Sequence, residues 1–125
     1  MDFNNREYFE YAGGSGGFID KFGYPFCRGR IFYTLEKNIN QYSDDKIFWA
    51  SGACMIIQKK TFYELGGFDE SFFAHMEEID LCWRGFNKGI ECFSSTDSIV
   101  YHVGAATLKE NANKNLSLIH ISEPT

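Results

Sequence analysis

The longest apolar stretch of the chain covers residues 47–57, and only Ser51 and Gly52 interrupt it. Its second half is rich in isoleucine, and a pair of lysines follows it after Gln58. A short apolar run that ends in charged residues is typical of a buried strand. The pattern therefore predicts a strand over residues 48–58.

Two later segments carry helix signals. Thr61 followed by Glu64 matches a capping box, and the glycine pair at 66–67 marks an end, so a short helix is predicted there. Residues 77–88 begin with acidic side chains, end with a lysine and precede a glycine, which predicts a longer helix. At 100° per residue, one face of this longer helix carries four apolar side chains: Ile79, Cys82, Trp83 and Phe86.

The rest of the chain is predicted to alternate between loops and short strands. Strands are expected at residues 8–12, 91–94 and 98–103. The glycine cluster at 13–17 and the polar stretch at 38–46 are predicted loops, and residues 18–33 are predicted to be irregular with turns. Asp80 and Arg84, four residues apart, form a favourable helical pair. Strand, helix and strand in this order indicate an α/β or α+β fold.

Composition excludes several classes of protein. Charged residues make up 23% of the 125 residues, hydrophobic residues 44%, and the formal net charge is −5, which does not favour nucleic-acid binding. Aromatic residues reach 18%, enough to build a core and to argue against disorder. No stretch approaches the roughly twenty apolar residues of a membrane-spanning helix, and no signal peptide is expected after Met1. The four cysteines show no zinc spacing and are predicted to be small core residues in a reduced compartment.

The last ten residues, 116–125, are expected to be foreign to the fold. They read LSLIHISEPT, which looks like the translation of a sequencing adaptor, and we interpret them as readthrough. On this interpretation residues 1–115 form one partial domain.

Three carboxylates crowd the start of the predicted longer helix: Glu77, Glu78 and Asp80. Acidic residues at this position favour the helix dipole and commonly face water. Crowded carboxylates can instead act as a general base or bind a divalent metal. Aromatic residues on both sides of the cluster favour a pocket.

Three other features carry candidate chemistry. Arg28 and Arg30 flank a glycine and could clamp phosphate or carboxylate groups, or could be solvated surface residues. His102 lies near the end of a predicted strand and is either structural or a ligand that needs carboxylate partners. Ser15 sits in a G-x-S-x-G pattern that resembles the nucleophile elbow of serine hydrolases, but the glycine and proline that follow favour a flexible loop.

Four ordered motifs resemble the family 2 glycosyltransferases with the GT-A fold, in particular their bacterial rhamnosyltransferase-like members. They are W-A-S-G-A-C at 49–54, G-G-F-D-E-S-F-F at 66–73, E-E-I-D-L-C-W-R at 77–84 and V-Y-H-V-G at 100–104. The resemblance covers roughly residues 8–108. It implies an α/β fold in which this chain is the C-terminal, acceptor-side half of a GT-A domain, with an incomplete sheet and flanking helices.

The resemblance implies an inverting transfer from a nucleotide-sugar donor to a hydroxyl of a glycan or lipid-linked acceptor, in the synthesis of envelope polysaccharide. A divalent metal, Mg or Mn, would stabilise the leaving diphosphate. The full-length protein is expected in the cytoplasm, at the inner face of the cytoplasmic membrane.

The resemblance also implies roles for particular residues. The catalytic base maps to Glu78, with Glu77 as the alternative because this chain has glutamate where aspartate is more usual. His102 maps to a metal ligand. The substrate-binding candidates are Trp49, Gly52, Asp69, Arg28 and Arg30.

The nucleotide-binding half of such enzymes, with its Asp-x-Asp metal motif, normally precedes the region that this chain resembles. Nothing in residues 1–48 resembles that half, so residues 1–115 are expected not to transfer sugar as an isolated polypeptide. The alternative function is a non-catalytic carbohydrate-binding module that stacks sugars on aromatic side chains: Trp49, Phe72, Phe73 and Trp83.

Overall fold

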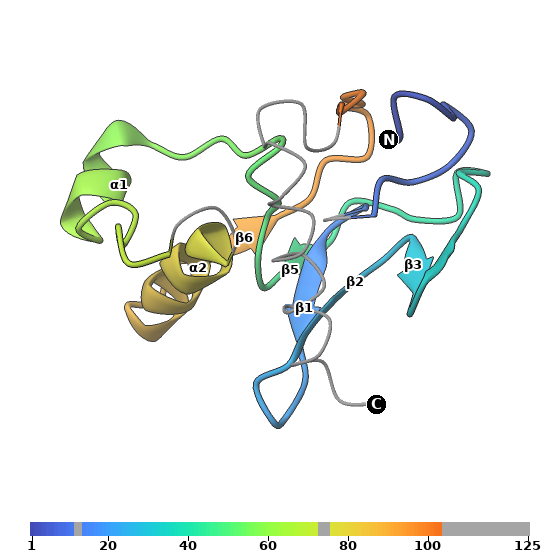
Figure 1. Ribbon diagram of the computed structural model, residues 1–125. Coiled ribbons are helices and arrows are strands. Elements are labelled where there is room, and N and C mark those ends of the chain that lie inside the picture. The colour runs from blue at the N-terminus through green and yellow to red at the C-terminus, as the bar shows by residue number, and fades with distance from the viewer. Residues whose placement is uncertain (12–13, 73–75, 104–125) are drawn as a thin grey trace.

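The computed structural model describes residues 1–11, 14–72 and 76–103. The described residues hold six short strands and two helices (Figure 1). In chain order these are β1 (Gly17–Ile19), β2 (Pro25–Cys27), β3 (Arg30–Ile31), β4 (Thr34–Leu35), β5 (Lys46–Ile47), α1 (Lys59–Glu64), α2 (Glu77–Asn87) and β6 (Cys92–Phe93). The mixture of helix and strand agrees with the predicted α/β class. The tail predicted at 116–125 lies outside the described residues.

The strands pair in three antiparallel ladders, β1 with β2, β3 with β4, and β5 with β6. The irregular structure predicted for residues 18–33 is therefore wrong, because this region holds most of two hairpins, whereas the turns predicted there are confirmed. Asp20 explains the first turn, since its Oδ1 accepts hydrogen bonds from the backbone N–H groups of Phe22 and Tyr24 at 2.8 and 3.0 Å. Figure 1 shows both helices on one side of the molecule and β3 on the other, with β1, β5 and β6 between them.

The strand predicted over residues 48–58 is not formed. β5 ends at Ile47, and Trp49 then makes an isolated bridge to Gly17. A turn follows, in which the N–H of Cys54 donates to the carbonyl oxygen of Ser51 at 3.0 Å. Ile56, beyond this turn, is 100% exposed. The prediction failed because local turn formation prevails over the apolar run.

Helix α1 begins earlier than its sequence pattern predicted. Its N-cap is Gln58, which makes no side-chain capping bond, so the expected capping box of Thr61 is wrong. The predicted end is confirmed, because Gly66 and Gly67 both adopt positive φ angles, of 87° and 70°. Their N–H groups donate back to carbonyl oxygens of the last turn, which closes the helix.

Helix α2 confirms the predicted span of 77–88 almost completely. Lys88 is its C-cap and the following Gly89 has a φ of 77°. The buried face, however, consists of Leu81, Cys82 and Gly85. Trp83 remains 43% exposed, and its ring packs edge-on against Phe48 at 5.7 Å. The predicted apolar face is thus only partly buried.

The strand predicted at 91–94 is confirmed by β6, in shorter form. Residues 98–103 form no strand, and His102 makes an isolated parallel bridge with Asp2. Tyr8, at the start of the strand predicted at 8–12, likewise makes an isolated bridge with Lys37, and residue 12 lies outside the described part. The predicted loops at 13–17 and 38–46 are confirmed where they are described, except that Gly17 opens β1 and Lys46 opens β5.

The core is a set of buried apolar side chains drawn from most of the described chain: Phe9, Cys27, Ile47, Trp49, Leu65, Leu81 and Cys82. The prediction of four core cysteines is half right, since Cys54 is exposed and Cys92 is half-buried, and all four are free thiols. Across the described ranges, neither helix is long and apolar enough to span a membrane.

Candidate functional site

The acidic pair Glu77 and Glu78 occupies the first turn of α2. The N-cap, Met76, has a φ of 73° and makes no side-chain capping bond. The acidic side chains of the first turn therefore stabilise this helix end, because they lie at the positive end of the helix dipole. Both carboxylates are partly withdrawn from solvent, because one oxygen of each is buried. The buried Oε2 of Glu77 accepts no hydrogen bond from the described residues. Half-buried carboxylates of this kind can accept a proton from a bound hydroxyl.

Gly52 brings a second predicted motif to this helix end. A Cβ atom placed on Gly52 would lie 3.9 Å from the carboxyl carbon of Glu78, so the backbone at 52 runs beside that carboxylate. The turn that began at Ser51 therefore places its glycine beside Glu78. The structure thus joins two of the four motifs that define the resemblance.

Trp49 lies in the core of the protein rather than at its surface. The indole is 6% exposed, and its Nε1 donates to the carbonyl oxygen of Phe18 at 2.9 Å. It packs so tightly on Gly17 that a Cβ there would come within 2.0 Å of the ring. Trp49 was predicted to bind substrate or to stack on a sugar, but in this structure it shows no face to a ligand, because it fills the core.

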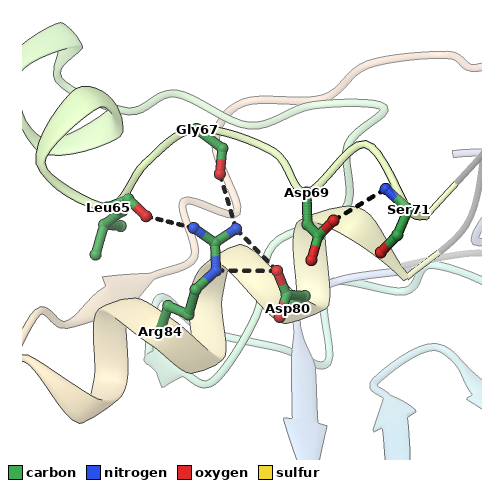
Figure 2. Close-up of polar contacts among 6 residues, drawn as sticks. All are labelled: Leu65, Gly67, Asp69, Ser71, Asp80 and Arg84. Atoms are coloured by element: carbon green, nitrogen blue, oxygen red, sulfur yellow. Dashed lines mark hydrogen bonds and ion pairs between the residues drawn. The ribbon is translucent and has the colours of Figure 1, made fainter.

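Asp69 is exposed, in the segment that leads from α1 to α2 (Figure 2). Its Oδ1 accepts the N–H of Ser71 at 2.9 Å, and the hydrogen bonds from Ser71 lower the pKa of this aspartate. The side chain is therefore a negatively charged group near neutral pH, held in place by its own turn.

Arg84 fixes that segment on α2, as Figure 2 shows. Its Nε donates to Oδ2 of Asp80 at 2.9 Å, which confirms the predicted helical pair. Nη2 also donates to the carbonyl oxygen of Gly67 at 2.7 Å, and Nη1 donates to that of Leu65. These carbonyl contacts, which sequence spacing does not reveal, couple the end of α1 to the helix that carries the acidic pair.

Arg28 is used within the fold. Its guanidinium donates twice to the carbonyl oxygen of Ser15, at 3.0 and 2.7 Å, and also to Ser43 and to the hydroxyl of Ser94. It therefore does not act as the predicted phosphate or carboxylate clamp in this structure, because its donors are committed to the chain. The guanidinium of Arg30 lies 4.2 Å from the centroid of the Tyr11 ring.

The glycine loop around Ser15 leads into strand β1. A nucleophile elbow requires a strand, a sharp turn and then a helix, so the serine hydrolase reading is wrong. The loop instead receives the Arg28 side chain on its backbone.

His102 lies beside the N-terminal segment. Its Nδ1 is 3.6 Å from Oε1 of Glu10, and its backbone bonds to Met1 and Phe3. Figure 1 shows this end of the described chain apart from α2, so the structure does not bring His102 and Glu78 together. Within residues 1–11, 14–72 and 76–103, no three His, Cys, Asp or Glu side chains are grouped so that they could hold a metal ion. The described residues therefore do not by themselves fit a divalent metal.

A cleft of about 770 Å³ adjoins the acidic pair without including either glutamate in its wall. Its lining includes Ser51, the neighbour of Gly52, and the buried face of α2 at Leu81 and Cys82. Strand β6 contributes Cys92 and Phe93 to the same wall. Sequence analysis missed this cleft, although the spacing of four residues from Glu78 to Cys82 places both on one helix face.

Comparison with known proteins identifies the family. The model of a family described as "Glycosyltransferase like family 2" matches residues 7–117, so the chain belongs to that family. An N-acetylglucosaminyl-diphospho-decaprenol L-rhamnosyltransferase of Mycobacterium tuberculosis is 29% identical over 72 residues, which are 57% of this chain and 24% of that protein. No solved structure matches the chain.

Two other relatives are similar over shorter stretches. Rhamnosyltransferase WbbL of Escherichia coli is 40% identical over 43 residues, 34% of this chain and 16% of that protein. The low-salt glycan biosynthesis hexosyltransferase Agl10 of Haloferax volcanii is 42% identical over 41 residues, 33% of this chain and 13% of that protein. The chain thus spans about a quarter or less of the length of these relatives.

Proposed function

We propose that this chain supplies the acceptor side of an inverting glycosyltransferase with a GT-A fold. The observation that carries the proposal is the approach of Gly52 to the Glu78 carboxylate, which assembles two family motifs around one half-buried acid. The family match over residues 7–117 supports the same reading.

In the proposed reaction an acceptor hydroxyl attacks the anomeric carbon of a nucleotide-sugar from the face opposite the diphosphate. The new carbon–oxygen bond forms as the bond to the diphosphate oxygen breaks, and the nucleoside diphosphate leaves with that electron pair. The hydroxyl proton passes to the carboxylate of Glu78, or of Glu77 as the alternative. Gly52 leaves room for the acceptor beside the acid, because any side chain at 52 would grow toward Glu78.

The names of the relatives suggest the substrate class. One is named for rhamnosyl transfer to a diphospho-decaprenol-linked sugar, and another for a hexosyl transfer in glycan biosynthesis. We therefore propose a deoxyhexose or hexose donor and a glycan or lipid-linked acceptor, in envelope polysaccharide synthesis. We further propose a cytoplasmic location at the inner face of the membrane, where a lipid-linked acceptor is reachable.

The divalent cation expected of such an enzyme, Mg or Mn, remains a proposal to which this chain offers one candidate ligand, His102. When bound, the cation would neutralise charge on the leaving diphosphate. The steps assigned to Glu78 and Gly52 do not depend on it.

Transfer is best tested in a chimera in which residues 7–115 replace the matching segment of the Mycobacterium tuberculosis relative. Glu78→Gln should lower kcat about 100-fold or more, since a general base commonly contributes that much. Glu77→Gln tests the alternative base, and Glu64→Gln on α1 is the matched control, whose rate should stay unchanged. A folded chimera with full activity after both Glu77 and Glu78 are replaced would contradict the assignment.

The chain of residues 1–125 by itself is proposed to bind acceptor without transferring sugar. Titration with an N-acetylglucosaminyl-diphospho-prenol, followed by NMR, should shift resonances of residues around Gly52 and Glu78. An absence of binding would overturn the proposal that the chain binds acceptor. Turnover of a nucleotide-sugar by the chain alone would overturn the proposal that it does not transfer sugar.

A non-catalytic carbohydrate-binding module is the second candidate function, supported by the exposure of Trp83 and Phe72. Trp49 is buried and contributes nothing to it, and Phe73 lies outside the described residues. Saccharide binding that Trp83→Ala abolishes and Glu78→Gln preserves, with no activity in the chimera, would favour this candidate.

A further inference from the structure

Two thiols meet at the junction of α2 and β6. The sulfur atoms of Cys82 and Cys92 lie 3.9 Å apart, and both side chains are free. A disulfide needs the sulfurs at about 2.05 Å, so rotation of the two side chains and a shift of roughly 2 Å would join them. No sequence motif marks this pair, because α2 ends and the chain reverses between the two residues.

The same two thiols border open space. Cys82 is buried against Trp49 and Cys27, but both Cys82 and Cys92 line the cleft of about 770 Å³. Cys92 is only half-buried. A small oxidant that enters the cleft therefore reaches the pair without unfolding of the chain.

The surroundings divide the two thiols into a nucleophile and a partner. The sulfur–sulfur hydrogen bond with Cys82 lowers the pKa of Cys92 to about 7. The same hydrogen bond, together with burial and the nearby charge of Glu78, raises the pKa of Cys82. Near neutral pH a substantial fraction of Cys92 is thiolate, which is the reactive form, while Cys82 stays protonated.

We propose that Cys82 and Cys92 form a redox-active dithiol, which a peroxide entering the cleft converts to an intramolecular disulfide. The Cys92 thiolate attacks one oxygen of hydrogen peroxide, the O–O bond breaks, and hydroxide leaves as a sulfenic acid forms. The Cys82 sulfur then attacks the Cys92 sulfur, and the Cys82 proton leaves with the displaced hydroxyl as water, while the proton first lost by Cys92 neutralises the hydroxide. Two thiols and one hydrogen peroxide thus give one disulfide and two waters, and a dithiol reductant reverses the change.

The disulfide would bind α2 to β6 one helical turn from Glu78. The Cys82 sulfur also interacts with the backbone of Ala50, two residues before Gly52. Movement of Cys82 toward Cys92 would therefore disturb both parts of the candidate site. This consequence rests on the proposed function, whereas formation of the disulfide does not.

The test is peptide mapping of the full chain, 1–125. The reduced protein is treated with hydrogen peroxide at pH 8, free thiols are blocked with N-ethylmaleimide, and the unreduced protein is digested with trypsin. Cleavage after Arg84 and Lys88 separates the two cysteines onto peptides 61–84 and 89–109. We expect these peptides to be found linked, two hydrogens lighter than their sum, in monomeric protein, and to separate on reduction with dithiothreitol.

Variants make the result specific. Cys92→Ser and Cys82→Ser should abolish the linked pair, and Cys54→Ser, which removes an exposed thiol of the same cleft, should leave it unchanged. Cys27→Ser removes the third thiol of the core cluster and should also leave the pair intact. Mapping of the unmutated chain does not depend on whether any variant folds. The proposal would be overturned if Cys82 and Cys92 both still react with N-ethylmaleimide after peroxide treatment. A disulfide that involves Cys27 or Cys54 in their place would overturn it as well.

Discussion

Gly17 and Trp49 show how one glycine lets a large aromatic ring enter the core. The indole covers the Gly17 backbone, and the two residues exchange backbone hydrogen bonds, Gly17 N–H to the Trp49 carbonyl at 2.9 Å and Trp49 N–H to the Gly17 carbonyl at 3.2 Å. In the sequence Gly17 looked like part of a flexible glycine loop. The absence of a side chain at position 17 instead lets the Trp49 ring pack directly on the backbone, where any Cβ would overlap the ring.

A pair of glycine substitutions tests this packing. Gly17→Ala should destabilise the chain by about 1–3 kcal/mol, because its Cβ would overlap the rigid, buried Trp49 ring. Gly85→Ala is the matched control on α2, where the new Cβ meets Leu65 at 3.6 Å and Ile90 at 3.7 Å, both ordinary contacts. Since alanine favours a helix over glycine, this variant should gain about 0.5–1 kcal/mol. Urea unfolding measures both, and equal effects of the two substitutions would refute the packing argument.

At the level of single residues the sequence predicts charge pairs better than burial. The acidic start of α2 and the Asp80–Arg84 pair follow from spacing alone, because a helix fixes which residues are neighbours. Trp49 opens the motif at 49–54, and no local pattern tells a core indole from a pocket indole. Likewise Arg28 looked available for a ligand, and only the fold brings Ser15, Ser43 and Ser94 to its guanidinium.

At the scale of elements, Arg84 explains how a short helix is held on a longer one. Helix α1 contains no buried residues of its own, so its position depends on the segment that follows it. That segment is held by the Arg84 contacts with Leu65 and Gly67 (Figure 2). The described part of the motif, residues 66–72, is thereby held to the helix that carries the acidic pair.

Removal of these contacts should loosen both elements. Arg84→Gln should cost about 2 kcal/mol of stability, because two carbonyl groups and the Asp80 carboxylate lose a charged donor. Arg84→Lys keeps the charge beside Asp80 but cannot reach all three acceptors, so an intermediate loss is expected. Lys60→Gln, which removes the exposed ion pair with Glu64 at 3.7 Å, should change stability by less than about 0.5 kcal/mol. An Arg84→Gln variant as stable as Lys60→Gln would contradict this account.

The elements that were predicted correctly are those with strong end signals. The span of α2 is marked by acidic residues, Lys88 and Gly89, and the end of α1 by two glycines, so both could be predicted. The strand at 48–58 was predicted from apolar content alone, and the turn at 51–54 overrides that content. The two hairpins over residues 17–35 were missed because their strands are only two or three residues long, too short for a periodic pattern.

At the scale of the whole molecule, polar side chains join segments that are far apart in the chain. Asp44 accepts two hydrogen bonds from Thr96, from its N–H at 2.6 Å and its hydroxyl at 2.7 Å. The Nη2 of Arg28 donates to the hydroxyl of Ser94, two residues before Thr96, at 2.9 Å. These links hold the loop before β5 against the segment after β6, so the cleft wall depends on contacts that no local sequence pattern could predict.

The Asp44 link should make stability depend on pH. Its hydrogen bonds from Thr96 lower the pKa of Asp44, so the folded chain favours the ionised form more than the unfolded chain does. The stabilisation is therefore present above about pH 4, the ordinary range of an aspartate, and is lost as the pH falls through the lower folded-state pKa. Asp44→Asn keeps the accepting oxygen but does not titrate, so the variant should be less stable than the unmutated chain at pH 7 and should approach it at about pH 2. Asp44→Ala, which removes the acceptor, should be destabilised at both pH values. Thermal unfolding followed by circular dichroism across this pH range measures the difference in stability. If the difference between Asp44→Asn and the unmutated chain stays constant with pH, the Asp44–Thr96 link is not its cause.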